Sequence, residues 1–105
     1  MHQKIPDQLY TQILEHIPIP CVDFVLVQNK KVLLTYRTQQ PAKDQWWIQG
    51  GRIHKNETLH DGVLRLAKRE IGTTNIRIIK KIGGYEFFSQ TTPIKEVTTG
   101  SHDIA

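Results

Sequence analysis

Acidic and basic side chains follow a double glycine at fixed spacing in the middle of the chain. Residues 50–72 read GGRIHKNETLHDGVLRLAKREIG, and five, seven, four and one residues separate Gly51, Glu57, Arg65, Glu70 and Gly72. Five fixed matches of this kind arise by chance roughly once in a million start positions. Ionised carboxylates are costly to bury unless they are paired with a cation or bound to a metal. The segment is therefore our first candidate for a functional site.

The spacing also predicts the helix that positions these groups. Thr58 followed by Asp61 is typical of a capped helix start, and Gly72 is a natural C-terminal stop. We therefore expect a helix over residues 58–71.

One face of this predicted helix is apolar. Leu59, Val63 and Leu66 recur at helical spacing, and Glu70 lies on the same stripe, four residues beyond Leu66. The Glu70 carboxylate is thus expected to face the interior of the fold. The alternative is that Glu70 only rims the core and pairs with a basic side chain.

Taken together, the glycines, Glu57, Arg65 and Glu70 resemble the Nudix box of hydrolases that act on nucleoside-diphosphate compounds. Nudix enzymes generally carry further glutamates after the box arginine, whereas this chain has Leu66 and Arg69 and keeps only Glu70. This departure resembles the GDP-mannose mannosyl hydrolases, whose box also has Arg-Leu. The flanking segments that resemble this subfamily are residues 23–27, 33–37, 41–42 and 46–52.

The resemblance implies an α/β fold, a Nudix-type α/β/α sandwich with a mixed sheet that is incomplete at its C-terminal side. It also implies one Mg²⁺ ion held by Glu70 and the Gly50 carbonyl, with Gly51, Glu57 and Arg65 as supporting box residues. Mg²⁺ suits such a site because it prefers oxygen ligands and bridges few protein groups to substrate phosphates.

In the resembled subfamily two arginines assist departure of the nucleoside diphosphate, and an aspartate lies near the reacting sugar carbon. These roles fall on Arg37, Arg52 and Asp23. Guanidinium groups bind phosphate oxygens in pairs and stay charged. The alternatives are surface positions for both arginines and a strand-end position for Asp23.

The implied reaction is hydrolysis of a nucleoside-diphosphate sugar by attack of water on the anomeric carbon. GDP-mannose is the leading candidate substrate. Such a reaction uses an anionic carboxylate, a metal on the leaving diphosphate and a base that activates water. The sequence offers no candidate for that base. The alternatives are a nucleotide-sugar-binding module without turnover and a Nudix pyrophosphohydrolase that attacks phosphorus.

Other patterns predict the elements around the box. Apolar positions between Leu9 and Ile17 predict a helix that ends at Pro18, and residues 21–27 and 32–36 predict a hairpin. Residues 46–48 and 75–88 predict strands, the latter interrupted at Gly83 and Gly84. We expect residues 90–105 to be a mobile loop, within which 103–105 resemble the beginning of a strand.

Length and composition predict one domain over residues 1–105, with a net charge of +4 and a pI of about 9.4. The basic residues are spread along the chain, which suits anionic substrates better than nucleic acid. No apolar run predicts a membrane span. The single cysteine, Cys21, excludes an internal disulfide and favours a cytoplasmic location. The family resemblance and an open sheet edge predict a homodimer.

Overall fold

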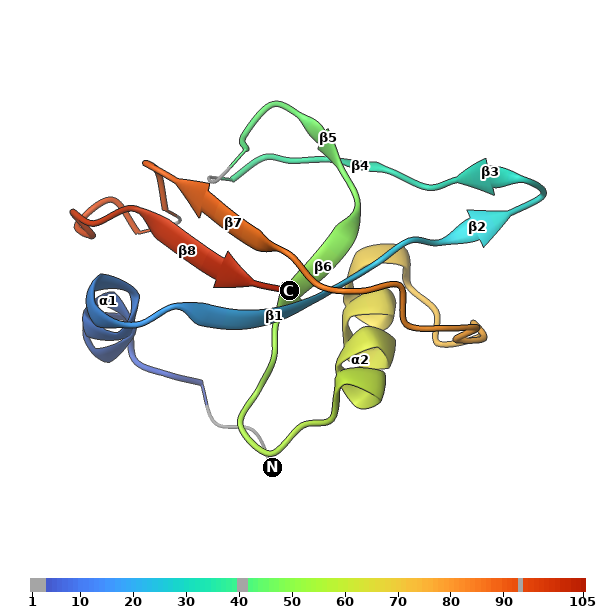
Figure 1. The fold of residues 1–105 in the computed structure, drawn as a ribbon, viewed down its shortest axis with the longest axis horizontal. Helices are drawn as coiled ribbons and strands as arrows, with labels where there is room; N and C mark the ends of the chain where they lie inside the picture. The colour runs from blue at the N-terminus through green and yellow to red at the C-terminus, as the bar shows by residue number, and fades with distance from the viewer. Residues whose placement is uncertain (1–3, 40–41, 93) are drawn as a thin grey trace.

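A computed structural model describes residues 4–39, 42–92 and 94–105 of the chain. The elements it contains follow one another as shown in Figure 1. In order they are α1 (Asp7–His16), β1 (Ile19–Phe24), β2 (Val27–Gln28), β3 (Lys31–Val32), β4 (Thr35–Tyr36), β5 (Trp46–Trp47), β6 (Gln49–Arg52), α2 (Leu59–Ile71), β7 (Glu86–Ser89) and β8 (Ser101–Ile104).

The main sheet has the order β6-β1-β8-β7. β1 is antiparallel to β6 and parallel to β8, and β8 is antiparallel to β7. The sheet is therefore mixed, and the predicted α/β class is confirmed. Short antiparallel ladders join β2 to β3 and β4 to β5.

The prediction of a loop over residues 90–105 is wrong at its C-terminal end, where only the expected strand at Asp103 and Ile104 is confirmed. Ser101–Ile104 form β8, which lies between β1 and β7 and pairs with both. A segment with little apolar content is stabilised here because the backbone groups on both of its edges are hydrogen-bonded. Such pairing comes from strands distant in the chain, so local composition does not reveal it.

The predicted strand over residues 75–88 is also mostly wrong, because the observed strand begins only at Glu86. Gly83 has φ 153°, and residues 73–85 form no regular element. The predicted hairpin is present but shorter, with β2 and β3 joined across Asn29 and Lys30, both at positive φ.

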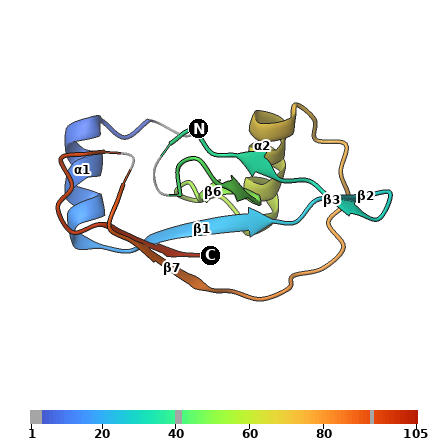
Figure 2. The ribbon, with the colours of Figure 1, turned by 90° about the horizontal axis from the view of Figure 1, so that it is seen from above.

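The core lies between α2 and the strands β1 and β6. Leu66 and Ala67 are completely buried, and Val63 lies beside them. α1 contributes no buried residue and lies near the beginning of β1, whereas α2 lies near its end (Figures 1 and 2). No helix within the described residues is long and apolar enough to span a bilayer.

Candidate active site

Glu57 and Arg65 tie the glycine turn to α2. Arg65 Nε donates to Glu57 Oε2 at 2.7 Å, and Arg65 Nη2 donates to Glu57 Oε1 at 2.9 Å. The same Nη2 donates to the Arg52 carbonyl on β6 at 2.8 Å, and the His54 amide donates to Glu57 Oε1 at 3.1 Å. The Arg65 guanidinium lowers the pKa of Glu57 to about 2. These two box residues therefore act as a structural clamp between β6, the turn and α2.

Gly51 allows α2 to approach β6 closely. A Cβ at Gly51 would lie 2.8 Å from Leu66 Cδ2 and 3.3 Å from Arg69 Nη2. Side chains alternate along a strand, so Gly50 and Arg52 face the side of the sheet opposite to α2. The short strand β6 thus has one face on the core and the other available to a ligand.

Gly50 lies directly opposite Asp23 in the β1–β6 ladder. A Cβ at Gly50 would collide with the Asp23 carboxylate, so a residue without a side chain is needed there. The Ile53 amide donates to the Pro20 carbonyl, and hydrogen-bonded pairs alternate with non-bonded ones along an antiparallel ladder. Gly50 is therefore in a non-bonded pair, and its carbonyl points away from β1 toward the outer edge of the sheet.

Glu70 lies in the last turn of α2, one turn beyond the buried Leu66. Its side chain is 30% exposed, and Oε1 pairs with Arg69 Nη2 at 2.9 Å. The expected interior position is therefore wrong, and Glu70 rims the core beside a basic side chain. The reason is its place along the helix axis, past the level at which Leu66 contacts Gly51. Because Arg69 Nη2 also lies next to Gly51, the Glu70 carboxylate is near the middle of β6.

These positions test whether a divalent cation fits. The Gly50 carbonyl on β6 and the Glu70 carboxylate in the last turn of α2 are oxygen donors on two elements that contact each other. Within the described part of the chain, no group of three or more His, Cys, Asp or Glu side chains is arranged to hold a metal. A donor set of this size fits an ion such as Mg²⁺, which keeps several waters and binds substrate phosphates.

Asp23 lies on the sheet face opposite to α2, near Arg37. Burial raises the pKa of Asp23, while the Tyr85 hydroxyl and the positive charge of Arg37 lower it. Tyr85 donates its hydroxyl hydrogen to Asp23 Oδ2. Arg37 follows β4, and its backbone amide donates to the Gln45 carbonyl at 2.9 Å. The structure thus brings two of the predicted residues, Asp23 and Arg37, into one electrostatic environment.

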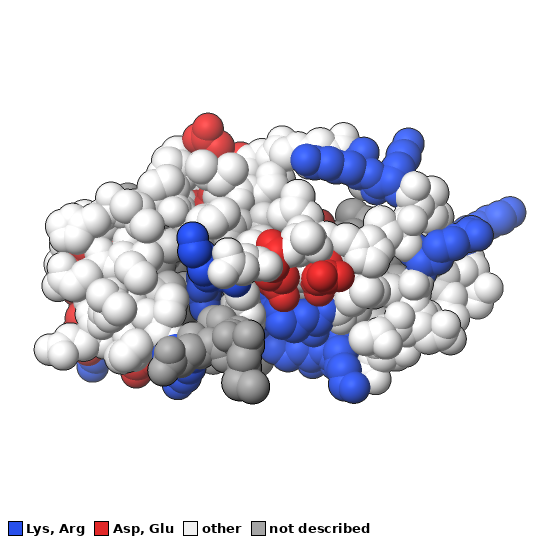
Figure 3. All heavy atoms as spheres, turned by 90° about the horizontal axis from the view of Figure 1, so that it is seen from below, with Lys and Arg blue, Asp and Glu red and all other residues white. Residues whose placement is uncertain are grey.

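Arg52 lies on the same face but is directed toward α1. Its guanidinium carbon is 5.3 Å from the centre of the Tyr10 ring, which is a cation–π geometry. A cavity of about 770 Å³ opens beside Arg52, with Lys4, Lys43 and Lys95 in its lining together with the single carboxylate Asp7. The excess of cations suits an anionic group. On the face shown in Figure 3, basic side chains lie beside acidic ones near the middle, and further basic side chains project at one end.

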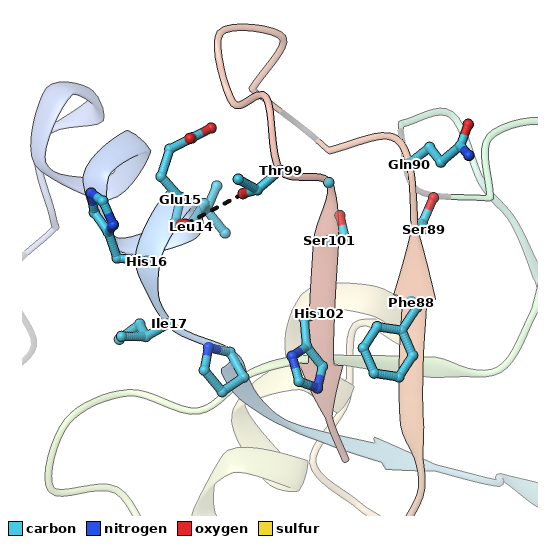
Figure 4. Close-up of a pocket in the computed structure, with 12 residues that line it drawn as sticks. Leu14, Glu15, His16, Ile17, Phe88, Ser89, Gln90, Thr99, Ser101 and His102 are labelled. Carbon is cyan, nitrogen blue, oxygen red and sulfur yellow. Dashed lines mark hydrogen bonds between the residues drawn. The ribbon is translucent and has the colours of Figure 1, made fainter.

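A second cavity, of about 550 Å³, lies between the end of α1 and the strands β7 and β8 (Figure 4). Its wall includes His102, which stacks on Phe88 with ring centres 4.3 Å apart. None of its lining residues belongs to the glycine turn or to α2. This cavity is therefore separate from the candidate site.

Sequence reasoning missed two polar residues on the Asp23 face. Tyr85 precedes β7 and bonds Asp23 across 62 positions of the chain. Asp103 lies on β8, and burial raises the pKa of its carboxyl, with the negative charge of Asp23 adding to the effect. Neither residue has a spacing relation to the box, so only the strand pairing could reveal them.

Comparisons with known proteins agree with this geometry. The family model described as NUDIX domain matches residues 18–104. The low-salt glycan biosynthesis protein Agl8 of Haloferax volcanii is 34% identical over 94 residues, which cover 90% of this chain and 60% of the relative. The chain thus spans less than two thirds of that relative's length.

Among solved structures, the crystal structure of a MutT/nudix family protein from Enterococcus faecalis has the same fold. It matches with a TM-score of 0.59 and 21% sequence identity, over 97% of this chain and 48% of that chain. The family model covers most of the chain, including the clamp, the glycine turn and the sheet. The chain belongs to the Nudix domain family.

Proposed function

We propose that this Nudix domain binds and hydrolyses a nucleoside-diphosphate sugar in a Mg²⁺-dependent reaction, with GDP-mannose as the leading substrate. The observation that carries the proposal is the placement of Asp23 directly opposite Gly50. A carboxylate thereby lies next to the glycine that offers its carbonyl to a metal. Such an arrangement suits a reaction in which a diphosphate leaves from a sugar carbon.

The side chains on the sheet face opposite to α2 have different roles in the proposed reaction. Arg37 and Arg52 would bind the diphosphate oxygens and stabilise the charge that develops on them as the bond to the sugar breaks. Asp23 would stabilise the positive charge that develops at the anomeric carbon. Water would attack that carbon and release the nucleoside diphosphate.

Glu70 and the Gly50 carbonyl would hold the Mg²⁺ ion, as the site geometry allows. When bound, the ion supplies positive charge that neutralises the leaving diphosphate. The ion pair between Glu70 and Arg69 holds the carboxylate near Gly51 on β6. Divalent metals are typical of Nudix hydrolases, which supports this part of the proposal.

The replacement of box glutamates supports carbon rather than phosphorus as the point of attack. Leu66 is completely buried against Gly51, so an acid at this position would have to be accommodated in the core. Arg69 pairs with Glu70 instead of adding another carboxylate. Fewer acids remain to activate a water at phosphorus. The name of the relative Agl8, a glycan biosynthesis protein, is in keeping with a sugar-containing substrate.

The same replacements favour a second candidate, a nucleotide-sugar-binding module without turnover. A module that only binds the nucleotide sugar needs neither the glutamates replaced by Leu66 and Arg69 nor a base that activates water. Tight binding of GDP-mannose without product formation would distinguish this candidate.

We also propose a homodimer in the cytoplasm. Both β6 and β7 are edges of the main sheet among the described strands, and an open edge favours pairing with another chain. The lone Cys21 is partly buried, and burial raises its pKa to about 12, so the thiol stays protonated. A single cysteine without a disulfide partner suits a reducing compartment. Light scattering that gives only the monomer mass would contradict the dimer.

The proposed activity is tested by incubating the chain with GDP-mannose and Mg²⁺ and measuring GDP and free mannose. We expect both products, their loss when the metal is chelated, and entry of heavy oxygen from labelled water into the sugar. Arg52→Lys keeps the charge but loses the planar fork, so turnover should fall about tenfold or more. The matched change Arg77→Lys, at an exposed position outside the box and the sheet, should leave turnover unchanged.

Two results would contradict the proposal. A folded chain that releases neither GDP nor mannose would exclude hydrolysis at carbon by this chain. Label that enters phosphate instead of mannose would assign the attack to phosphorus.

A further inference from the structure

Tyr85 joins the β7–β8 ladder to the Asp23 carboxylate. Its hydroxyl donates to Asp23 Oδ2, although the two residues are 62 positions apart in the chain. The other carboxylate oxygen, Oδ1, lies where a side chain on Gly50 would stand. The Asp23 carboxylate therefore has the Gly50 backbone beside Oδ1 and the Tyr85 hydroxyl beside Oδ2.

The backbone of Tyr85 is itself held firmly. Its amide donates to the Ala105 carbonyl at 2.7 Å, and the Ala105 amide donates to the Tyr85 carbonyl at 2.9 Å. This reciprocal pair extends the β7–β8 ladder by one step. Two residues later, Phe87 lies on the same side of the strand and packs on Trp47, with ring centres 5.7 Å apart.

The Tyr85 hydroxyl remains a donor across the neutral range. Burial raises its pKa, and the hydrogen bond to Asp23 and the negative charge of that residue raise it further. A phenol donating to an ionised carboxylate makes a charge-assisted hydrogen bond, which is stronger than one between neutral groups.

We propose that Tyr85 is a positioning residue that holds the Asp23 carboxylate in the orientation needed next to the sugar's anomeric carbon. This inference rests on the proposed hydrolysis at that carbon. An aspartate has two rotatable bonds, so without the phenol the carboxylate can turn away from Gly50. A misplaced catalytic group lowers the rate of the chemical step while the binding of the nucleoside diphosphate, which rests on other residues, is retained.

The chain contains a matched control for this hydrogen bond. Tyr36 also donates its hydroxyl to an aspartate, Asp44 Oδ1, at 3.3 Å. That pair is exposed, joins the end of β4 to the loop before β5, and does not include Asp23. Tyr85→Phe and Tyr36→Phe therefore each remove one phenol hydroxyl that is bonded to a carboxylate, and only the former is at the site.

The experiment measures kcat and KM for GDP-mannose with Mg²⁺, and GDP affinity by calorimetry, for both variants of the whole chain. We expect Tyr85→Phe to lower kcat about tenfold or more, as for loss of a hydrogen bond to a charged group. KM and the Kd for GDP should change less than about twofold. Tyr36→Phe should change none of these quantities.

A double-mutant cycle with Asp23→Asn shows whether Tyr85 acts through Asp23. In the Asp23→Asn background, Tyr85→Phe should lower kcat by less than about twofold, because the group it positions is no longer charged. The same four proteins should show coupled free energies of unfolding, which reports the hydrogen bond independently of turnover.

Several results would overturn the inference. These are an unchanged or increased kcat for Tyr85→Phe, an equal loss of kcat in both backgrounds, or additive unfolding energies. A loss of GDP affinity as large as the loss of kcat would show a merely structural role. A wild-type chain that binds GDP-mannose without turnover would instead reject the proposed function, and the positioning role with it, even where the unfolding cycle shows the hydrogen bond.

Discussion

At the scale of single residues, the two glutamates of the box have different surroundings. Glu57 accepts hydrogen bonds from the Arg65 side chain and from the His54 amide, so both of its oxygens are engaged. Glu70 has only its neighbour Arg69 as an ion-pair partner in the described structure and is open to water. Glu57 is thus suited to holding the turn in place, while Glu70 is the carboxylate available to a cation.

The clamp predicts a loss of stability for Glu57→Gln. The substitution removes the charge that the Arg65 fork binds, so the free energy of unfolding should fall by about 1–3 kcal/mol. Denaturation with urea measures this change. Asp61→Asn is the matched control, because the Asp61 side chain is 69% exposed and its ion-pair partner among the described residues is the neighbouring His60, at 3.5 Å. An exposed pair of this kind should contribute less than about 1 kcal/mol.

The pH dependence of the same pair gives a further check. The pKa of Glu57 is lowered from an ordinary value of 4.5 to about 2, so the folded state favours the ionised form. The stabilisation is complete above the ordinary pKa and is lost as the pH falls from about 4.5 toward about 2. The stability difference between wild type and Glu57→Gln should shrink over this interval. A difference that grows on acidification would contradict the clamp.

At the scale of elements, α2 is defined by its two ends. Thr58 Oγ1 accepts a hydrogen bond from the Asp61 amide at 3.1 Å, and Gly72 ends the helix with φ 80°. Between them, buried positions hold α2 against β1 and β6. The predicted cap, the predicted stop and the helix itself are confirmed, because each depends on side chains close together in the chain.

The cap predicts the effect of changing Thr58. Thr58→Ala leaves the Asp61 amide without its partner and should lower the free energy of unfolding by about 1 kcal/mol. Thr58→Ser keeps the hydroxyl and should retain most of the stability. Thermal and urea unfolding of both variants measure the difference. Equal losses for alanine and serine would show that the methyl group, and not the hydrogen bond, is responsible.

At the scale of the whole molecule, the two faces of the main sheet have different roles, one in the core and one at the candidate site. One face packs against α2 through Leu66 and Gly51, and the other presents Asp23 and Arg52. The central strand β8 connects these parts to β7 and so to Tyr85. Residues 73–84, by contrast, are mostly exposed and form no regular element.

This distribution of burial predicts the order of hydrogen exchange. Amides of α2 around the completely buried Leu66 and Ala67, and those of β1, should exchange slowest. Amides of residues 73–84 should exchange fastest among the described residues, because few of their groups are buried or bonded in a ladder. Mass spectrometry of exchanged peptides measures both. Protection of 73–84 equal to that of α2 would contradict the structure.

The sequence by itself determined the box, the capped helix α2 and the family, because these depend on residue types at short, fixed spacing. The identity of Glu57 and Arg65 as partners was not evident from spacing alone, and neither was the exposure of Glu70. The pairing follows from how the middle of α2 lies against the glycine turn, and the exposure of Glu70 from where the last turn of α2 lies relative to β6.

Only the tertiary structure decided that Ser101–Ile104 form a central strand and that Asp23 lies between Gly50 and Tyr85. These contacts join segments separated by tens of residues. Their stability comes from backbone pairing and from burial on a shared sheet face. Neither can be predicted from local composition. The site is therefore assembled from a local motif that the sequence displays and from distant strands that only the fold brings to it.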